Sequence, residues 1–252
     1  MTTSSHVDLR TLRAPLIAKL SRFVDLTARE RAHLEELQTD FVKIRPGIDI
    51  MTAGHAYRCI FTLNRGMAIR YKVLHDGRRQ ILSLVLPGDF VGLPGGLFDN
   101  CLYSIASLTE AVCCSIPFSI LFDLFQGYPR LGTAMFWLAG HEAALYAEHL
   151  VGVGRQSAYE RVAHLLLELL FRLQIAGFAE DDRSYALPMT QELMADTLGL
   201  SVPHINRTLR RLREDGLISI EGSRVTCLDV SALSRVSDFD GANLGRLRIP
   251  GL

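Results

Sequence analysis

Residues 190–213 constrain the fold of this chain more than any other part of its sequence. Two short helical segments flank Gly199, whose missing side chain permits the left-handed backbone of a tight turn. Ala195 is small enough to let the two segments approach each other, and Ile205 is placed to fill the core between them. Ser201 precedes the second segment as a plausible N-cap. This spacing predicts a helix-turn-helix unit.

The second segment of this unit carries four arginines and no acidic residue. A helix-turn-helix lays such a helix in the major groove of DNA, where its N-terminal residues reach the base edges. The alternative is a helical hairpin within a core, with the arginines on a solvated face, but caps, turn and charge together favour DNA binding. The candidate DNA-contacting residues are Ser201, Pro203, His204, Asn206, Arg207, Arg210 and Arg211.

Side-chain chemistry suggests roles for several of these residues. Arg207 offers two donors that match O6 and N7 of guanine. Asn206 suits either an adenine or a phosphate. Arg211 and Arg213 are expected to contact phosphate or to pair within the chain with Glu214 and Asp215.

Two short β-branched runs follow the basic helix. Residues 218–220 and 224–227 surround Gly222-Ser223, which is a hairpin signal. A hairpin in this place is the wing of a winged helix.

The composition narrows the class of protein. The 252 residues are 48% hydrophobic and carry a formal net charge of zero, so any DNA binding must come from local charge. No apolar run reaches the length of a membrane span, and the first residues lack the pattern of a signal peptide. We therefore expect a cytoplasmic protein that does not engage a membrane.

The cysteines form no metal-binding pattern. Their spacing contains no C-x-x-C pair and argues against an iron–sulfur cluster. In a reducing compartment they are expected to be small core residues, with thiol sensing as the alternative. They are Cys59, Cys101, Cys113, Cys114 and Cys227.

The N-terminal half predicts two helices followed by a small β domain. Residues 16–37 have helical periodicity, and Thr27 with Glu30 forms a capping box that opens the second helix. From Phe41 onward, short apolar runs alternate with turn signals, which indicates a compact all-β unit. Asp76-Gly77 is the best hairpin candidate in it.

A long helix is predicted from Pro129 to Val151. Its apolar stripe either packs against its own β domain or forms a coiled-coil seam between two protomers. Gly152-Val-Gly154 is expected to interrupt the helix as a hinge, and Ser157 with Glu160 forms a second capping box. The proposed dimer seam comprises Leu131, Met135, Leu138, His141, Glu142 and Leu145.

Several segments resemble one family in the same order along the chain. They are residues 64–71, 76–82, 86–92, 106–112, 115–117 and 154–163. Together with the winged helix they are similar to the Crp/Fnr family of bacterial transcription regulators. The resemblance implies an α+β fold with an N-terminal antiparallel β-roll sensor domain (16–127), a long dimerisation helix with its hinge (128–153), a C-terminal winged helix-turn-helix (154–235) and a tail (236–252). It also implies a homodimer that binds a two-fold symmetric double-stranded DNA operator and works with RNA polymerase.

Two departures from the family pattern bear on the signal and the operator. Cyclic-nucleotide-binding members bind the ribose with a Glu and the phosphate with an Arg, and Leu93 and Tyr103 stand at those two positions. Without the guanidinium a buried phosphate would lack its partner, so no cyclic nucleotide is expected. Pro203 stands where many members carry a base-reading Glu, so the half-site should differ from the common one.

The remaining pocket suggests either an apolar effector or a collapsed core. Its candidate residues are Leu93, Gly95, Gly96, Leu97, Tyr103 and Ser104. No cofactor and no metal site are predicted, and the polar pairs 141–142 and 148–149 are interpreted as solvated. Haem is the open alternative, because some members bind it through a His, and His55, His75, His141 and His149 are present. No catalytic motif is found, so an enzyme is the weakest candidate. The leading rival function is a haem- or small-molecule-binding sensor in which DNA binding is secondary.

Overall fold

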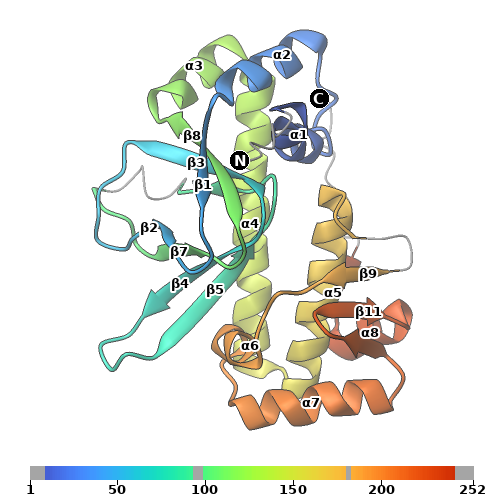
Figure 1. Ribbon diagram of the computed structural model, residues 1–252. Helices are drawn as coiled ribbons and strands as arrows, with labels where there is room; N and C mark the ends of the chain where they lie inside the picture. Colours follow the sequence, from blue (N-terminus) through green and yellow to red (C-terminus); the bar gives the residue numbers. More distant parts are fainter. Residues whose placement is uncertain (1–8, 93–98, 180–182, 242–252) are drawn as a thin grey trace, which may run out of the picture. The chain divides into compact units, whose positions relative to one another are not determined.

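The computed structural model describes residues 9–92, 99–179 and 183–241. Its contacts divide the chain into two compact units. The first contains the described residues up to 68 together with 85–135, and the second contains 69–84 together with the described residues from 136 onward. Figure 1 labels their helices and strands.

Two N-terminal helices open the first unit. Helix α1 (Leu9–Leu20) begins earlier than its periodicity suggested, and α2 (Ala28–Leu37) follows a short turn. The Thr27 side chain accepts from the Glu30 backbone N–H, and the Glu30 carboxylate accepts from the Thr27 backbone N–H. The predicted capping box is therefore confirmed.

Antiparallel strands follow these helices in the first unit, as expected for a β-roll. One sheet has the order β1-β8-β3-β6, and β2 pairs with β7. The bounds are β1 (Asp40–Ile44), β2 (Asp49–Met51), β3 (Cys59–Arg65), β6 (Phe90–Val91), β7 (Ser104–Ser107) and β8 (Ala111–Pro117). Alternate side chains of these strands form an apolar core that includes Met51, Leu63, Ile105 and Cys113.

A helix that the sequence did not suggest, α3 (Ser119–Gly127), follows the strands. The long helix α4 (Pro129–Arg155) comes next and runs from the first unit into the second. The interruption predicted at Gly152-Val-Gly154 is wrong, because α4 continues through both glycines to Arg155. A glycine costs a helix only about 1 kcal/mol relative to alanine, and no proline blocks the hydrogen-bond ladder here.

The second unit begins with a hairpin. Strands β4 (Ala68–Val73) and β5 (Arg79–Val85) meet at a turn in which Gly77 has φ +85°. The Leu74 N–H donates to the Arg78 carbonyl at 2.8 Å, which closes the turn. The hairpin predicted at Asp76-Gly77 is confirmed.

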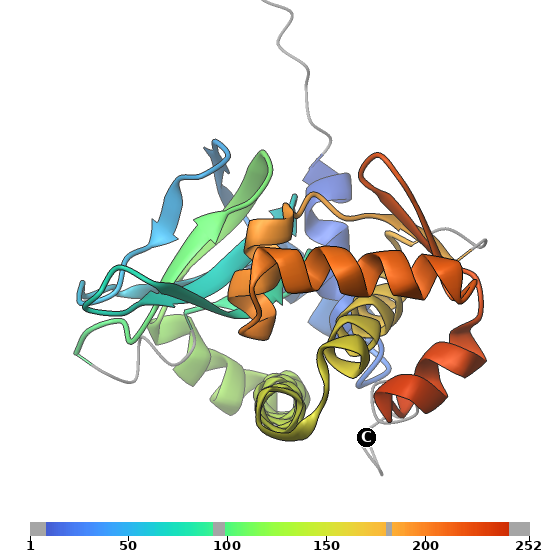
Figure 2. The same ribbon diagram turned by 90° about the horizontal axis from the view of Figure 1, so that it is seen from below.

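The C-terminal part of this unit is built around α5 (Ala158–Ala176), which begins at the predicted Ser157–Glu160 capping box. Its buried residues include Val162, Leu166 and Leu169. Helices and strands pack around it, and Figure 2 shows α7 in front of α5. They are β9 (Ser184–Ala186), α6 (Gln191–Leu198), α7 (Val202–Glu214), β10 (Ile218–Glu221), β11 (Arg224–Cys227) and α8 (Val230–Ser237).

Candidate nucleic-acid interface

The turn between α6 and α7 has the geometry that the sequence predicts. Gly199 has φ +63° and ends α6, and its N–H donates to the Ala195 carbonyl. Thr190 caps the start of α6 by accepting from the Leu193 N–H at 3.2 Å. Ser201 occupies the N-cap position of α7, but its side chain makes no capping hydrogen bond. Its hydroxyl is thus not committed to the helix.

The two helices share a small core. Ala195 is 7% exposed, and Ile205 and Leu212 are fully buried at 0%. Thr208 and Leu209 are buried beside them. One face of α7 therefore packs against the rest of its domain, and the opposite face is exposed to solvent.

All seven residues that the sequence predicts as DNA contacts lie at the exposed surface around α7. They are Ser201, Pro203, His204, Asn206, Arg207, Arg210 and Arg211. The surface is continuous along α7, and Figure 2 shows this helix at the side of its unit nearest the viewer. Such a helix can enter a major groove without rearrangement of the helix-turn-helix core.

The arginines of α7 differ in their partners. Arg210 Nε lies 2.7 Å from a Glu214 carboxylate oxygen, and Arg211 Nε lies 3.7 Å from that of Asp215. The Arg211 guanidinium also lies 4.7 Å from the centre of the Tyr159 ring on α5. Arg207 has no hydrogen-bond or ion-pair partner among the described residues. Of these three guanidinium groups, that of Arg207 is the one that no other described residue holds.

A contact that the sequence did not suggest orients Asn206. Gln191 is the first residue of α6, and its Nε2 donates to Asn206 Oδ1 at 3.0 Å. This leaves the Asn206 amide nitrogen free to donate outward. The pairing depends on how α6 crosses α7, so no local sequence signal could have revealed it.

The predicted wing is present beside this helix. Strands β10 and β11 form an antiparallel hairpin in which Glu221 pairs with Arg224, and Gly222 at the turn has φ +60°. Strand β9 adds a third strand that the sequence did not suggest. The Leu187 N–H donates to the Ser223 carbonyl at 2.7 Å and ties the wing to the segment before α6.

The residues of the proposed dimer seam lie mostly inward. Leu131, Met135 and Leu138 are 1%, 5% and 6% exposed within the single chain. Glu142 forms an ion pair with Arg70 of β4. His141 and Leu145 are half-buried. Side chains that are already buried offer little further surface to a partner.

The candidate effector pocket is only partly described. Leu93, Gly95, Gly96 and Leu97 lie outside the described residues. Tyr103 is half-buried and packs against the apolar core of the strands. Ser104 is buried, and its hydroxyl accepts from the Ala53 N–H at 3.0 Å. These two side chains contribute to the β domain itself.

The histidines considered for haem do not share one environment. His55 and His75 are exposed, and His141 is half-buried. His149 was interpreted as solvated, but this is wrong, since its side chain is 22% exposed and bonded to buried Glu168. Among the described residues, no three His, Cys, Asp or Glu side chains are grouped to hold a metal ion.

The cysteines have the environment of core residues. Burial raises the pKa of Cys113 to about 12, and the neighbouring Cys114 adds to this effect. Burial likewise raises the pKa of Cys114 to about 11 and that of Cys227 to about 12. A thiol with a raised pKa is a poor nucleophile, which disfavours thiol sensing at these three positions. Within the described ranges, no helix is long and apolar enough to cross a membrane.

Comparisons with known proteins agree with this architecture. The family model described as "Crp-like helix-turn-helix domain" matches residues 160–236, and the one described as "Cyclic nucleotide-binding domain" matches residues 41–128. Among solved structures, FixK2 from Bradyrhizobium japonicum has a TM-score of 0.70 at 24% identity, covering 78% of this chain and 96% of that one. This likeness shows the shared fold.

Curated relatives extend the likeness to sequence. The nitrogen fixation regulation protein FixK of Azorhizobium caulinodans is 34% identical over 178 residues, 70% of this chain and 71% of that protein. The transcriptional activatory protein AadR of Rhodopseudomonas palustris is 33% identical over 171 residues, 68% of this chain and 70% of that one. The chain therefore belongs to the Crp/Fnr family of DNA-binding transcription regulators.

Proposed function

We propose that this regulator works as a homodimer whose two α7 helices bind the half-sites of a two-fold symmetric operator, and that it acts there with RNA polymerase. The observation that carries the proposal is the exposed face of α7, on which Arg207 has no partner within the described chain. An arginine near the N-terminal half of a recognition helix can form two hydrogen bonds with guanine. The polymerase follows from family membership.

The remaining exposed residues define the expected half-site. Pro203 has no donor or acceptor in its side chain, so it cannot accept from cytosine as a Glu in this place would. Asn206 presents its amide nitrogen while Gln191 holds its oxygen. The half-site should therefore contain one guanine read by Arg207 and an acceptor, on a base or a phosphate, within reach of Asn206.

The dimer surface that we propose is the exposed stripe of α4. This stripe repeats with alternating steps of four and three residues, which is the heptad spacing of a coiled coil. Phe136 and Leu150 are 71% and 74% exposed, and the residues between them are small enough for two helices to approach closely. The stripe comprises Phe136, Gly140, Ala143, Ala147, Leu150 and Gly154.

Replacing Leu150 with Glu is expected to weaken dimerisation by about 3 kcal/mol or more. The variant would bury an uncompensated charge in each half of the seam. The protomer should fold normally because Leu150 is exposed in the single chain. Sedimentation equilibrium measures the effect, and Leu9→Glu on exposed α1 is the matched control.

Leu138→Glu distinguishes this stripe from the inward one. Leu138 is 6% exposed, so its replacement should unfold the protomer rather than release folded monomers. The opposite result would be a Leu138→Glu variant that is folded but monomeric and a Leu150→Glu variant that stays dimeric. It would show that the dimer seam runs through Leu131, Met135 and Leu138 instead.

Selection of genomic fragments by the purified protein, followed by footprinting, tests the proposed function. The expected result is protection of two inverted half-sites centred about 34 Å apart, one helical turn of DNA. Adding cyclic AMP should leave the affinity unchanged, because Leu93 and Tyr103 stand where the family has the ribose-binding Glu and the phosphate-binding Arg. A folded dimer that enriches no DNA sequence would contradict the proposed function. An operator affinity that rises when cyclic AMP is added would contradict the expectation that the protein binds no cyclic nucleotide.

A further inference from the structure

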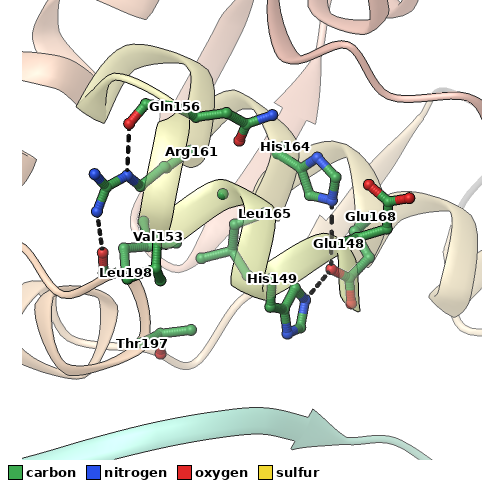
Figure 3. Close-up of a pocket in the computed structure, with 11 residues that line it drawn as sticks. Glu148, His149, Val153, Gln156, Arg161, His164, Leu165, Glu168, Thr197 and Leu198 are labelled. Atoms are coloured by element: carbon green, nitrogen blue, oxygen red, sulfur yellow. Dashed lines mark hydrogen bonds and ion pairs between the residues drawn. The ribbon is translucent and has the colours of Figure 1, made fainter. Parts of the chain in front are cut away.

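A buried ionic cluster lies where α4 meets α5. Glu168 is the one acidic residue in an apolar run of α5, and its side chain is 1% exposed. One of its carboxylate oxygens lies 2.6 Å from His149 Nε2, and the other lies 2.9 Å from Arg172 Nη1. Figure 3 shows His149 directed at this carboxylate across the pocket. A buried carboxylate needs such partners to remain charged.

The cluster joins three elements of the second unit. His149 belongs to α4, while Glu168 and Arg172 belong to α5. His149 Nδ1 lies 3.3 Å from the Leu82 carbonyl, and Arg172 Nη2 donates to the Leu84 carbonyl at 2.9 Å, both on β5. The angle between α4 and the first helix of the DNA-binding domain is thus held by polar contacts in addition to packing.

The geometry identifies the protonation state that this arrangement needs. Both ring nitrogens of His149 face oxygen acceptors, namely the Glu168 carboxylate and the Leu82 carbonyl. A neutral imidazole carries one N–H, so it can satisfy only one of them, whereas the imidazolium donates to both. The complete set of contacts therefore requires protonated His149.

The pocket beside the cluster suits water better than a ligand. The space in it that water can occupy measures about 30 Å³, enough for one or two water molecules. His164 also lines it, and within the described residues neither of its ring nitrogens has a hydrogen-bond partner. His164 Nε2 lies 4.0 Å from Glu168, too far for a hydrogen bond. The His149 side chain is 22% exposed, so it can exchange its proton with solvent.

Other charged and titratable groups surround the pair. On α4 and α5 they are Glu148, Arg161, His164 and Arg172, on β9 it is Tyr185, and after α8 they are Asp238 and Asp240. Hairpin β4–β5 contributes Arg79, which pairs with Asp196 of α6 at 2.8 Å. Of these, only Arg172 forms an ion pair with the Glu168 carboxylate closer than 3 Å.

The electrostatics of the pair give the direction of its pH response. Burial by itself lowers the pKa of His149, but the charge and hydrogen bond of Glu168 outweigh it, and the pKa is raised. Burial opposes ionisation of Glu168, yet His149 and Arg172 lower its pKa to about 2. The stabilisation from His149 is complete below its ordinary pKa of about 6.5 and is lost as pH rises through the raised value.

We propose that the His149–Glu168 pair is a pH-sensitive link that holds α5 against α4, and that a rise in pH that deprotonates His149 loosens it and weakens operator binding. The two recognition helices of a dimer must match the spacing of the half-sites. A looser contact between α4 and α5 leaves the recognition helix less preorganised for this spacing and so lowers the affinity for the operator. The effect on DNA rests on the proposed function, whereas the loosening itself does not.

Operator affinity and hydrogen exchange, measured from pH 6 to pH 9, test the link. For the wild-type protein we expect the operator Kd to rise about tenfold over this pH range. The rate of amide hydrogen exchange near the start of α5, corrected for the intrinsic effect of pH on exchange, should also rise about tenfold. A factor of about ten corresponds to the free energy of one hydrogen bond to a charged group. His149→Gln should remove this pH-dependent step, because glutamine does not titrate. His164→Gln is the matched control and should retain the step.

Two outcomes would overturn the link. One is a His149→Gln variant with the same pH profile as wild type, and the other is a profile abolished by His164→Gln alone. Ring NMR of wild-type His149 supplies a reading that needs no variant to fold, and a pKa at or below about 6.5 would also refute the proposal. If exchange and NMR show the step while no operator is bound at any pH, the proposed function fails and the link stands.

Discussion

Replacing Glu168 with Gln is expected to lower the free energy of unfolding by about 3–5 kcal/mol. The substitution keeps the shape of the side chain but leaves Arg172 and His149 without their shared anion in a buried place. Two-state urea unfolding at neutral pH measures the effect, with an unchanged m-value showing that the same surface is exposed.

Glu148→Gln is the matched control for this prediction. Glu148 lies next to His149 on α4 but is exposed, so its loss should cost less than about 0.5 kcal/mol. A Glu168→Gln/Arg172→Gln double variant should lose less stability than the two single variants added together, because the second change removes the orphaned charge. Equal, small losses for Glu168→Gln and Glu148→Gln would show that the cluster adds nothing to stability.

The local structure of this protein follows closely from its sequence. Thr27 and Ser157 form the capping boxes predicted from the Glu three residues later, and Gly77 and Gly222 make the predicted turns. Gly199 ends α6 in the left-handed conformation. These features depend on residues a few positions apart, so a sequence contains the information they need.

The features that escaped prediction depend on residues far apart in the chain. The apolar stripe through Leu131 and Leu138 has the spacing of a helix packed on its own β domain and also that of a dimer seam, and periodicity does not distinguish the two. Only the folded chain shows that the apolar stripe is already buried. The apolar residues of a helix indicate which face is buried. They do not indicate whether that face packs against the same chain or against a partner protomer.

The buried cluster illustrates the same limit. His149 and Glu168 are nineteen positions apart and lie on different helices. A single acid within the apolar run of α5 was the available signal, since an unpaired carboxylate there would be costly. The identity of its partner required the crossing of α4 and α5.

Arg207→Ala is expected to cost about 1–3 kcal/mol of specific DNA binding and to relax base preference mainly at one symmetric base pair. Of Arg207, Arg210 and Arg211, Arg207 is the one whose guanidinium has no partner among the described residues, so its binding to DNA need not break an internal contact. Titration of a base-substituted operator series at two salt concentrations measures both effects.

Arg211→Ala provides the comparison that decides the role of Arg207. Arg211 pairs with Asp215 and lies over the Tyr159 ring, so at most it should reach the DNA backbone. Loss of a phosphate contact weakens binding to all sequences alike and reduces the salt dependence. If Arg207→Ala shows that uniform loss with base preference intact, Arg207 contacts the backbone instead. The base reader would then be Asn206, held by Gln191, or His204 beside it.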